Sequence, residues 1–82
     1  MVKVDYDDNF KQIFSKIKDN LLRIKIEKQI EKIIQNPEIG KPMQHNRKGT
    51  REIYVKPFRL SYAYHKGEDL LVFLDFYHKD EQ

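Results

Sequence analysis

The chain has 82 residues, which is enough for one domain, residues 1–82, with a modest hydrophobic core. It contains no cysteine, which excludes a disulfide framework and a thiolate zinc site and is typical of a reducing compartment. Hydrophobic residues make up 39% of the sequence, but no run reaches the roughly 20 apolar residues of a membrane span. The first residues also lack the apolar run of a signal peptide. We therefore expect a soluble, cytoplasmic protein that does not associate with membranes.

The formal net charge is only +3, but the positive charge is concentrated in one stretch. Between Gly40 and Lys56 the sequence has a single acidic residue, Glu52. Such a local excess attracts polyanions and is typical of a surface that binds phosphate backbones, although a merely solubilising loop can have the same composition. The candidate residues for binding a phosphate backbone are Lys41, His45, Arg47, Lys48, Arg51 and Lys56.

The first part of the chain predicts a strand followed by two helices. Alternation of apolar and polar residues over Val2–Tyr6 predicts a short strand at an edge of a sheet or beside a later strand. The acidic run before Phe10 can cap a helix, and Pro37 ends the second helix. We expect the two helices to form an antiparallel hairpin. Their apolar stripes are Phe10, Ile13, Phe14 and Ile17 in the first and Leu22, Ile26, Ile30 and Ile33 in the second.

The second part of the chain predicts three strands. Alternation indicates Arg51–Lys56 and Phe58–Tyr64, and an apolar run indicates Leu70–Tyr77. A polar, glycine-containing segment joins the last two strands, which suits a hairpin and not a parallel crossover. The order β-α-α-β-β-β predicts an α+β fold with an N-terminal strand and an antiparallel sheet. The helical hairpin should cover one face of that sheet and leave the other face free.

The register of the last hairpin is predicted by matching apolar faces. A three-residue loop at 66–68 matches them along the whole hairpin and places Arg59 opposite Asp75 on the free face. This pair is either a solvated ion pair of small energetic effect or part of a functional site. The expected apolar pairs are Tyr64 with Leu70, Tyr62 with Val72, Leu60 with Leu74, and Phe58 with Phe76.

Several classes of site are disfavoured by the motifs. The segment Gly40–Gly49 lacks the spacing of a phosphate-binding P-loop and precedes a strand, which argues against nucleotide hydrolysis. The three histidines are scattered among lysines, which argues against a metal site. No glycine elbow surrounds Ser61, so a Ser-His-Asp nucleophile is not indicated. We expect neither a cofactor nor a metal.

A basic surface with Arg59, Tyr77 and His78 near it has a chemical meaning. RNA can be cleaved without a metal when its 2′-hydroxyl attacks the adjacent phosphate. That reaction needs a proton acceptor, a cation for the phosphoryl oxygens and an acid for the leaving 5′-oxygen. Histidine, arginine and lysine have suitable chemistry, although a lone histidine near a chain end is more often a solvated side chain.

Motifs spread over nearly the whole chain match one known pattern. They are Lys41-Pro42-x-x-His45-Asn46-x-x-Gly49, Tyr54, Phe58-Arg59-Leu60-x-Tyr62-Ala63-Tyr64, Leu70-Leu71 and Tyr77-His78-Lys79-Asp80-Glu81. Together they resemble the RelE/ParE superfamily of toxins, close to its archaeal RelE-like members and the YoeB branch. The resemblance implies the toxin of a type II toxin–antitoxin system. Such a toxin is a metal-independent endoribonuclease, or mRNA interferase, that inhibits translation by cleaving mRNA in the ribosomal A site.

The resemblance also implies site residues. Arg59 matches the arginine of the family's R-L-x-Y strand, which is proposed to stabilise the phosphate. His78 matches the YoeB-type histidine, and Tyr77 lies beside it. The sequence departs from the family in two places: Glu52 and Tyr54 stand where bacterial RelE has catalytic lysines, and Asp80 stands near its second arginine. Glu52 is a candidate general base because it is the only acid in the basic region. On a regular strand His78 would face the helices, so it needs a bulge or a strand end to reach a substrate.

The family also implies partners. Its toxins bind a RelB-like antitoxin, often as a heterotetramer, and act on the ribosome and mRNA. The alternative hypothesis is a ParE-like or degenerate member that binds a protein or a nucleic acid without cutting RNA.

Overall fold

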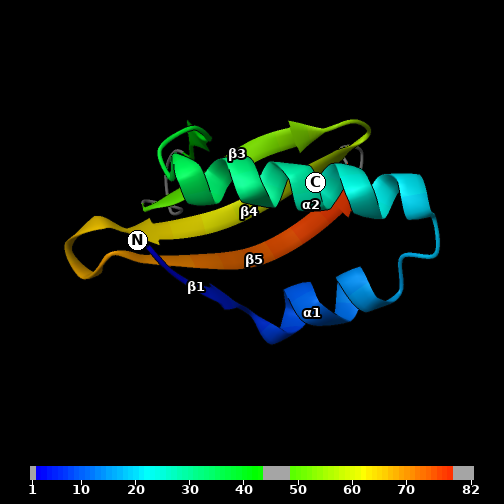
Figure 1. Cartoon of the computed structure of the whole chain (residues 1–82), viewed down its shortest axis with the longest axis horizontal. Coiled ribbons are helices and arrows are strands. Elements are labelled where there is room, and N and C mark those ends of the chain that lie inside the picture. Colours follow the sequence, from blue (N-terminus) through cyan, green and yellow to red (C-terminus); the bar gives the residue numbers. More distant parts are fainter. Residues whose placement is uncertain (1, 44–48, 79–82) are drawn as a thin grey trace.

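The structure is a computed structural model that describes residues 2–43 and 49–78. The five strands form one sheet in the order β1-β5-β4-β3-β2, and the two helices precede most of it in sequence (Figure 1). This arrangement confirms the predicted α+β fold, to which it adds the two-residue strand β2. The elements are β1 (Lys3–Tyr6), α1 (Asp8–Ser15), α2 (Asn20–Gln35), β2 (Lys41–Pro42), β3 (Thr50–Val55), β4 (Phe58–His65) and β5 (Leu70–His78).

The two helices run in opposite directions, as expected for the predicted antiparallel hairpin (Figure 1). Asp7 caps α1 by accepting a hydrogen bond from the backbone N–H of Asn9, and Asp19 caps α2 in the same way. Arg23 of α2 donates hydrogen bonds to the carbonyl oxygens of Phe14 and Ile17, at 3.4 and 3.0 Å, and so holds the end of α1 against α2. Neither described helix is long and apolar enough to cross a membrane.

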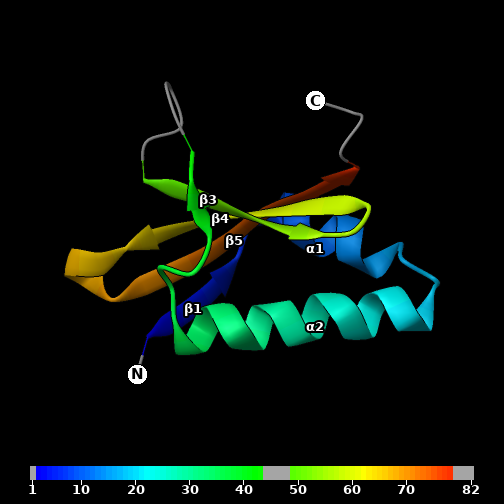
Figure 2. The ribbon, with the colours of Figure 1, turned by 90° about the horizontal axis from the view of Figure 1, so that it is seen from above.

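The sheet has one face that α2 follows along its length and one that no described helix covers (Figure 2). We call the second the open face. Strand β1 lies at an edge of the sheet and pairs in parallel with β5, with Lys3 opposite Leu70 and Tyr6 opposite Phe73. This confirms its predicted place. Strands β3, β4 and β5 are antiparallel neighbours, so the open face is built mainly from these three.

The predicted register between β4 and β5 is wrong. The loop has four residues, 66–69, because Asp69 takes a left-handed conformation (φ 51°) and Leu70 pairs with His65. A bulge then leaves Leu74 as an extra residue between Phe73 and Asp75. The observed pairs are Tyr64 with Leu71, Tyr62 with Phe73, Ser61 with Asp75, Leu60 with Phe76, Arg59 with Tyr77, and Phe58 with His78.

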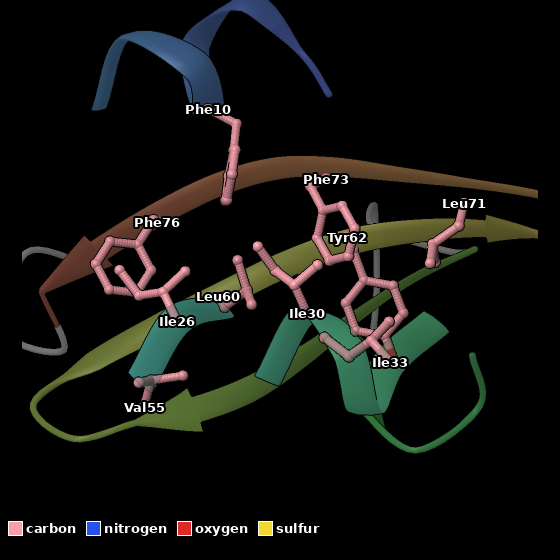
Figure 3. Packing of buried hydrophobic residues seen from close by; sticks show 10 residues of the cluster. All are labelled: Phe10, Ile26, Ile30, Ile33, Val55, Leu60, Tyr62, Leu71, Phe73 and Phe76. Atoms are coloured by element: carbon pink, nitrogen blue, oxygen red, sulfur yellow. The ribbon is translucent and has the colours of Figure 1, made fainter. Parts of the chain in front are cut away.

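The bulge decides which residues of β5 enter the core. Leu71 and Phe73 are fully buried before the bulge and Phe76 is buried after it, whereas Leu70, Val72 and Leu74, which the predicted register turned inward, are only half-buried. Phe73 stacks on Tyr6 with ring centroids 5.4 Å apart. Figure 3 shows the buried cluster between α2, α1 and the sheet, which comprises Phe10, Ile26, Ile30, Ile33, Val55, Leu60, Tyr62, Leu71, Phe73 and Phe76.

Candidate functional site on the open face

One arginine lies at the centre of the open face. Arg59 of β4 is paired with Tyr54 of β3 on one side and Tyr77 of β5 on the other. Directly opposite residues of antiparallel strands project to the same face, so the three side chains form one row across the sheet. The arginine carbon Cζ is 6.0 Å from the centroid of the Tyr54 ring, within the range of a cation–π contact. Tyr54 itself is 50% exposed.

A carboxylate joins two members of this row. Glu52 is two residues before Tyr54 on β3 and therefore projects to the same face. Its Oε1 accepts a hydrogen bond from Nη1 of Arg59 at 2.5 Å, and its Oε2 accepts one from the hydroxyl of Tyr77. Glu52 is only 8% exposed, while the arginine side chain is 32% exposed. The two ionised groups are therefore paired at the bottom of the open face, and the arginine is the part that solvent reaches.

The small residues of β4 make this contact possible. Glu52 is paired with Ser61 on the neighbouring strand, whose short side chain leaves room for the carboxylate to lie against the sheet. The hydrogen bond with Glu52 raises the pKa of Arg59 above its ordinary value, and partial burial opposes that effect. Arg59 is therefore charged throughout the physiological range. Its Nε is buried and has no hydrogen-bond partner within the described residues.

Asp75 does not pair with Arg59, contrary to the expectation from the predicted register. The bulge at Leu74 moves Asp75 opposite Ser61. Its Oδ1 accepts hydrogen bonds from the side-chain amide of Asn9 at 3.2 Å and from the backbone N–H of Phe76 at 2.8 Å. Glu52 takes the position of ionic partner instead, although it lies on the other neighbouring strand.

His78 lies on the opposite side of the sheet from this cluster. It is paired with Phe58, and the two rings meet edge to face with centroids 5.3 Å apart. Phe58 packs against the buried core, and His78 lines a cavity of about 470 Å³ whose lining also includes Ile13, Ile17, Asp75 and Tyr77. The bulge therefore does not bring His78 to the open face. It lies at Leu74, before both Asp75 and His78, so these two residues still project to opposite faces of the strand.

The residues of the predicted basic surface do not all lie on one exposed surface. Lys41 and Lys56 are exposed, but Arg51 is half-buried on the same side as Ile53 and Val55. Its Nη1 donates to the carbonyl oxygens of Glu38 and Gly40, at 2.9 and 2.7 Å. His45, Arg47 and Lys48, the other predicted members, lie outside the described residues.

Tyr62, which the sequence predicts only as a member of the apolar face, has a hydroxyl that is bonded to main-chain atoms. The hydroxyl of Tyr62 donates to the carbonyl oxygen of Pro37 at 2.9 Å and accepts from the backbone N–H of Gly40 at 2.8 Å. Gly40 has no side chain, and a Cβ there would lie 2.5 Å from that hydroxyl oxygen. Burial raises the pKa of Tyr62 above its ordinary value. Together with Arg51, this tyrosine fastens the segment after α2 to the sheet.

The described residues contain no group of three or more histidine, aspartate or glutamate side chains placed to hold a metal ion. The chemical groups that the open face does bring together are a guanidinium, a buried carboxylate and a phenolic hydroxyl. A guanidinium can bind phosphate oxygens, a carboxylate can accept a proton and a phenol can donate one.

Comparison with known proteins gives a family. The family model of the ParE toxin of the type II toxin–antitoxin system parDE matches residues 4–82. No curated protein matches the chain in sequence. The fold is similar to several solved toxin structures, all of which have low sequence identity to it.

A chain of the intact E. coli RelBE toxin–antitoxin complex has a TM-score of 0.81 and 14% identity, covering 95% of this chain and 96% of that one. A chain of the RelBE2 toxin–antitoxin complex from Mycobacterium tuberculosis has a TM-score of 0.79 and 20% identity, covering 95% and 98%. The YoeB/ParE toxin from Agrobacterium tumefaciens has a TM-score of 0.82 and 14% identity, covering 94% and 98%. Because the family model spans nearly all of the sequence, the chain belongs to the ParE toxin family of type II toxin–antitoxin systems, within the RelE/ParE superfamily.

Proposed function

We propose that this toxin is a metal-independent endoribonuclease that cleaves mRNA in the ribosomal A site and so inhibits translation. The observation that carries the proposal is the cluster of Arg59, Glu52 and Tyr77 on a sheet face that no described helix covers. These side chains supply the three roles that metal-free RNA cleavage requires, and they come from three adjacent strands.

Each group has one role in the proposed reaction. The carboxylate of Glu52 accepts the proton of the RNA 2′-hydroxyl, whose oxygen attacks the adjacent phosphorus. Arg59 stabilises the negative charge on the phosphoryl oxygens. The hydroxyl of Tyr77 donates a proton to the leaving 5′-oxygen, so the products are a 2′,3′-cyclic phosphate and a free 5′-hydroxyl. His78 is not used, because its ring lies against Phe58 on the other side of the sheet.

The proposal extends to partners. The E. coli and M. tuberculosis structures are toxin–antitoxin complexes. By analogy we propose that a RelB-like antitoxin inhibits this chain, with acidic residues placed over the open face and further association into a heterotetramer. The exposed Lys41 and Lys56 would then contact RNA or the ribosome when the antitoxin is absent.

A ParE-like function, in which the chain binds a protein or a nucleic acid without cutting RNA, is the second candidate. Two observations favour it. Arg59 already has an ionic partner in Glu52, and the histidine that the YoeB resemblance implies as a site residue is on the helix side. Neither observation removes the groups needed for cleavage, so the ParE-like binding function remains the alternative and not the main proposal.

The test is to treat the purified toxin with EDTA, remove the chelator and the free metal by dialysis, incubate the toxin with translating ribosomes, and map the mRNA ends. Cleavage at A-site codons by the metal-free toxin, with 2′,3′-cyclic phosphate ends, is the expected result. Folded toxin that leaves the mRNA intact would contradict the endoribonuclease and support the binding function.

A further inference from the structure

The partner of Arg59 is unusual for a residue that has to bind a phosphate. A carboxylate and a phosphate both present negatively charged oxygens to a guanidinium, and both use the same N–H groups. In this chain the Nη1 of Arg59 is already hydrogen-bonded to Oε1 of Glu52. A phosphate that binds Nη1 therefore has to compete with a carboxylate of the protein itself.

Glu52 is held in place from two sides. Tyr77 donates to its second oxygen, and the carboxylate is 8% exposed beside the small side chain of Ser61. The arginine is the more accessible partner, at 32% exposed. The guanidinium is therefore the member of the pair that a ligand from solvent reaches.

We propose that Glu52 is a built-in competitor of the substrate: its carboxylate occupies the phosphate-binding side of Arg59 until an RNA phosphate displaces it. This inference concerns the same open face as the proposed function and deepens it by naming the ligand, a phosphodiester of single-stranded RNA. Displacement also releases the carboxylate from its ion pair, which leaves it able to accept the proton of the 2′-hydroxyl. Phosphate binding and the readiness of the base are then coupled through one contact.

The test measures binding and does not depend on cleavage. The probe is a short single-stranded oligoribonucleotide with 2′-O-methyl groups, which cannot be cut by 2′-hydroxyl attack. We expect Glu52→Gln to bind it about tenfold more tightly than the native chain, which is the scale of one hydrogen bond between charged groups. The slope of log K against log salt should steepen by about 0.7, because one more cation becomes available to the phosphates.

Removing any negative charge strengthens RNA binding to some degree, so the control must match the charge. Asp75→Asn is that control, because Asp75 lies one row from Arg59 but is bonded to Asn9 and to the backbone of Phe76. Its effect should be clearly smaller. The gain from Glu52→Gln should also vanish in an Arg59→Gln background, because there is no longer a guanidinium to release.

A second measurement covers weak binding and poor folding. Inorganic phosphate can be titrated against the Nε–H resonance of Arg59, and Glu52→Gln should respond at a lower phosphate concentration than the native chain. If that variant does not fold, Tyr77→Phe replaces it, since loss of the hydroxyl that holds Glu52 should give a smaller gain of the same sign. Equal affinities in Glu52→Gln, Asp75→Asn and the native chain, or no response of Arg59 to either probe, would overturn the inference. If Glu52→Gln binds the oligoribonucleotide more tightly but the native chain never cuts mRNA, only the endoribonuclease proposal is contradicted.

Discussion

Each face of the sheet contains a tyrosine whose hydroxyl is hydrogen-bonded. The partners of the two hydroxyls differ, and the difference distinguishes a structural contact from one that a ligand can replace. On the helix side, Tyr62 is bonded to main-chain atoms of Pro37 and Gly40. On the open face, Tyr77 is bonded to the ionised side chain of Glu52, which is also bound by Arg59. Main-chain partners cannot be exchanged without unfolding the segment, whereas side-chain partners at a surface can be exchanged for a ligand.

The largest effect expected from this comparison concerns two adjacent leucines of β5. Leu71 is fully buried on the helix side, while Leu70 is half-buried on the other. Leu71→Ala should lower the free energy of unfolding by about 2–5 kcal/mol, because it removes buried apolar atoms and leaves a cavity. Leu70→Ala should cost clearly less. Urea denaturation of both variants measures the difference, and a larger loss at Leu70 would support the regular register that the sequence predicts.

On the open face the expected loss is in rate. Arg59→Gln should slow mRNA cleavage on ribosomes by about 100- to 1,000-fold, because a charged donor to the transition state is lost. Glutamine is preferred to alanine because it can still donate a hydrogen bond to the buried carboxylate of Glu52. Lys66→Gln is the matched control, since Lys66 forms an exposed salt bridge with Glu38 at 3.5 Å, away from the cluster. Equal rates in both variants would remove Arg59 from the mechanism.

A smaller effect is expected for the hydroxyl on the helix side. Tyr62→Phe should lower the free energy of unfolding by about 1–2 kcal/mol, because the carbonyl of Pro37 and the N–H of Gly40 lose their partner. The pH dependence follows from the raised pKa of Tyr62. In the unfolded chain Tyr62 ionises near pH 10, whereas in the folded chain it still holds its proton at that pH. The contribution of the Tyr62 hydroxyl to stability is therefore fully present below about pH 10 and is lost as the pH rises above it.

Tyr62→Phe should therefore be less sensitive to alkaline pH than the native chain, which thermal unfolding between neutral and alkaline pH can measure. Tyr54→Phe is the control on the open face, because Tyr54 is 50% exposed. Identical alkaline profiles for the native chain and Tyr62→Phe would contradict the assignment.

The smallest expected effect separates two basic residues that composition alone treats as equivalent. Lys56→Gln should reduce the slope of log K against log salt for RNA binding by about 0.7, the contribution of one phosphate contact. Arg51→Gln should leave that slope unchanged and lower the melting temperature, because its guanidinium is bound to the carbonyl oxygens of Glu38 and Gly40. An equal reduction in slope for both variants would return Arg51 to the RNA-binding surface.

The periodicity of the sequence was enough to predict both helices, every strand of the sheet except β2, and the α+β class. Phe10, Ile26, Ile30 and Ile33 are buried as their spacing indicates, and Asp7, in the acidic run before Phe10, caps the first helix. These features depend on residues within one or two turns of each other, so neighbouring residues contain the information. The family was also recognisable from short motifs, and the match to residues 4–82 confirms it.

The partners of the charged residues were decided only by the tertiary structure. Arg59 was expected to meet Asp75, but one extra residue in the loop and the bulge at Leu74 moved the pairing and left Glu52 as its ionic partner. Arg51 was predicted to bind phosphate, but in the structure its guanidinium is bonded to carbonyl oxygens of the segment after α2. A register depends on the packing of whole faces against the helices, and a single bulge changes it at little local cost. The sequence by itself therefore determined which groups are present, and the sheet determined which of them meet.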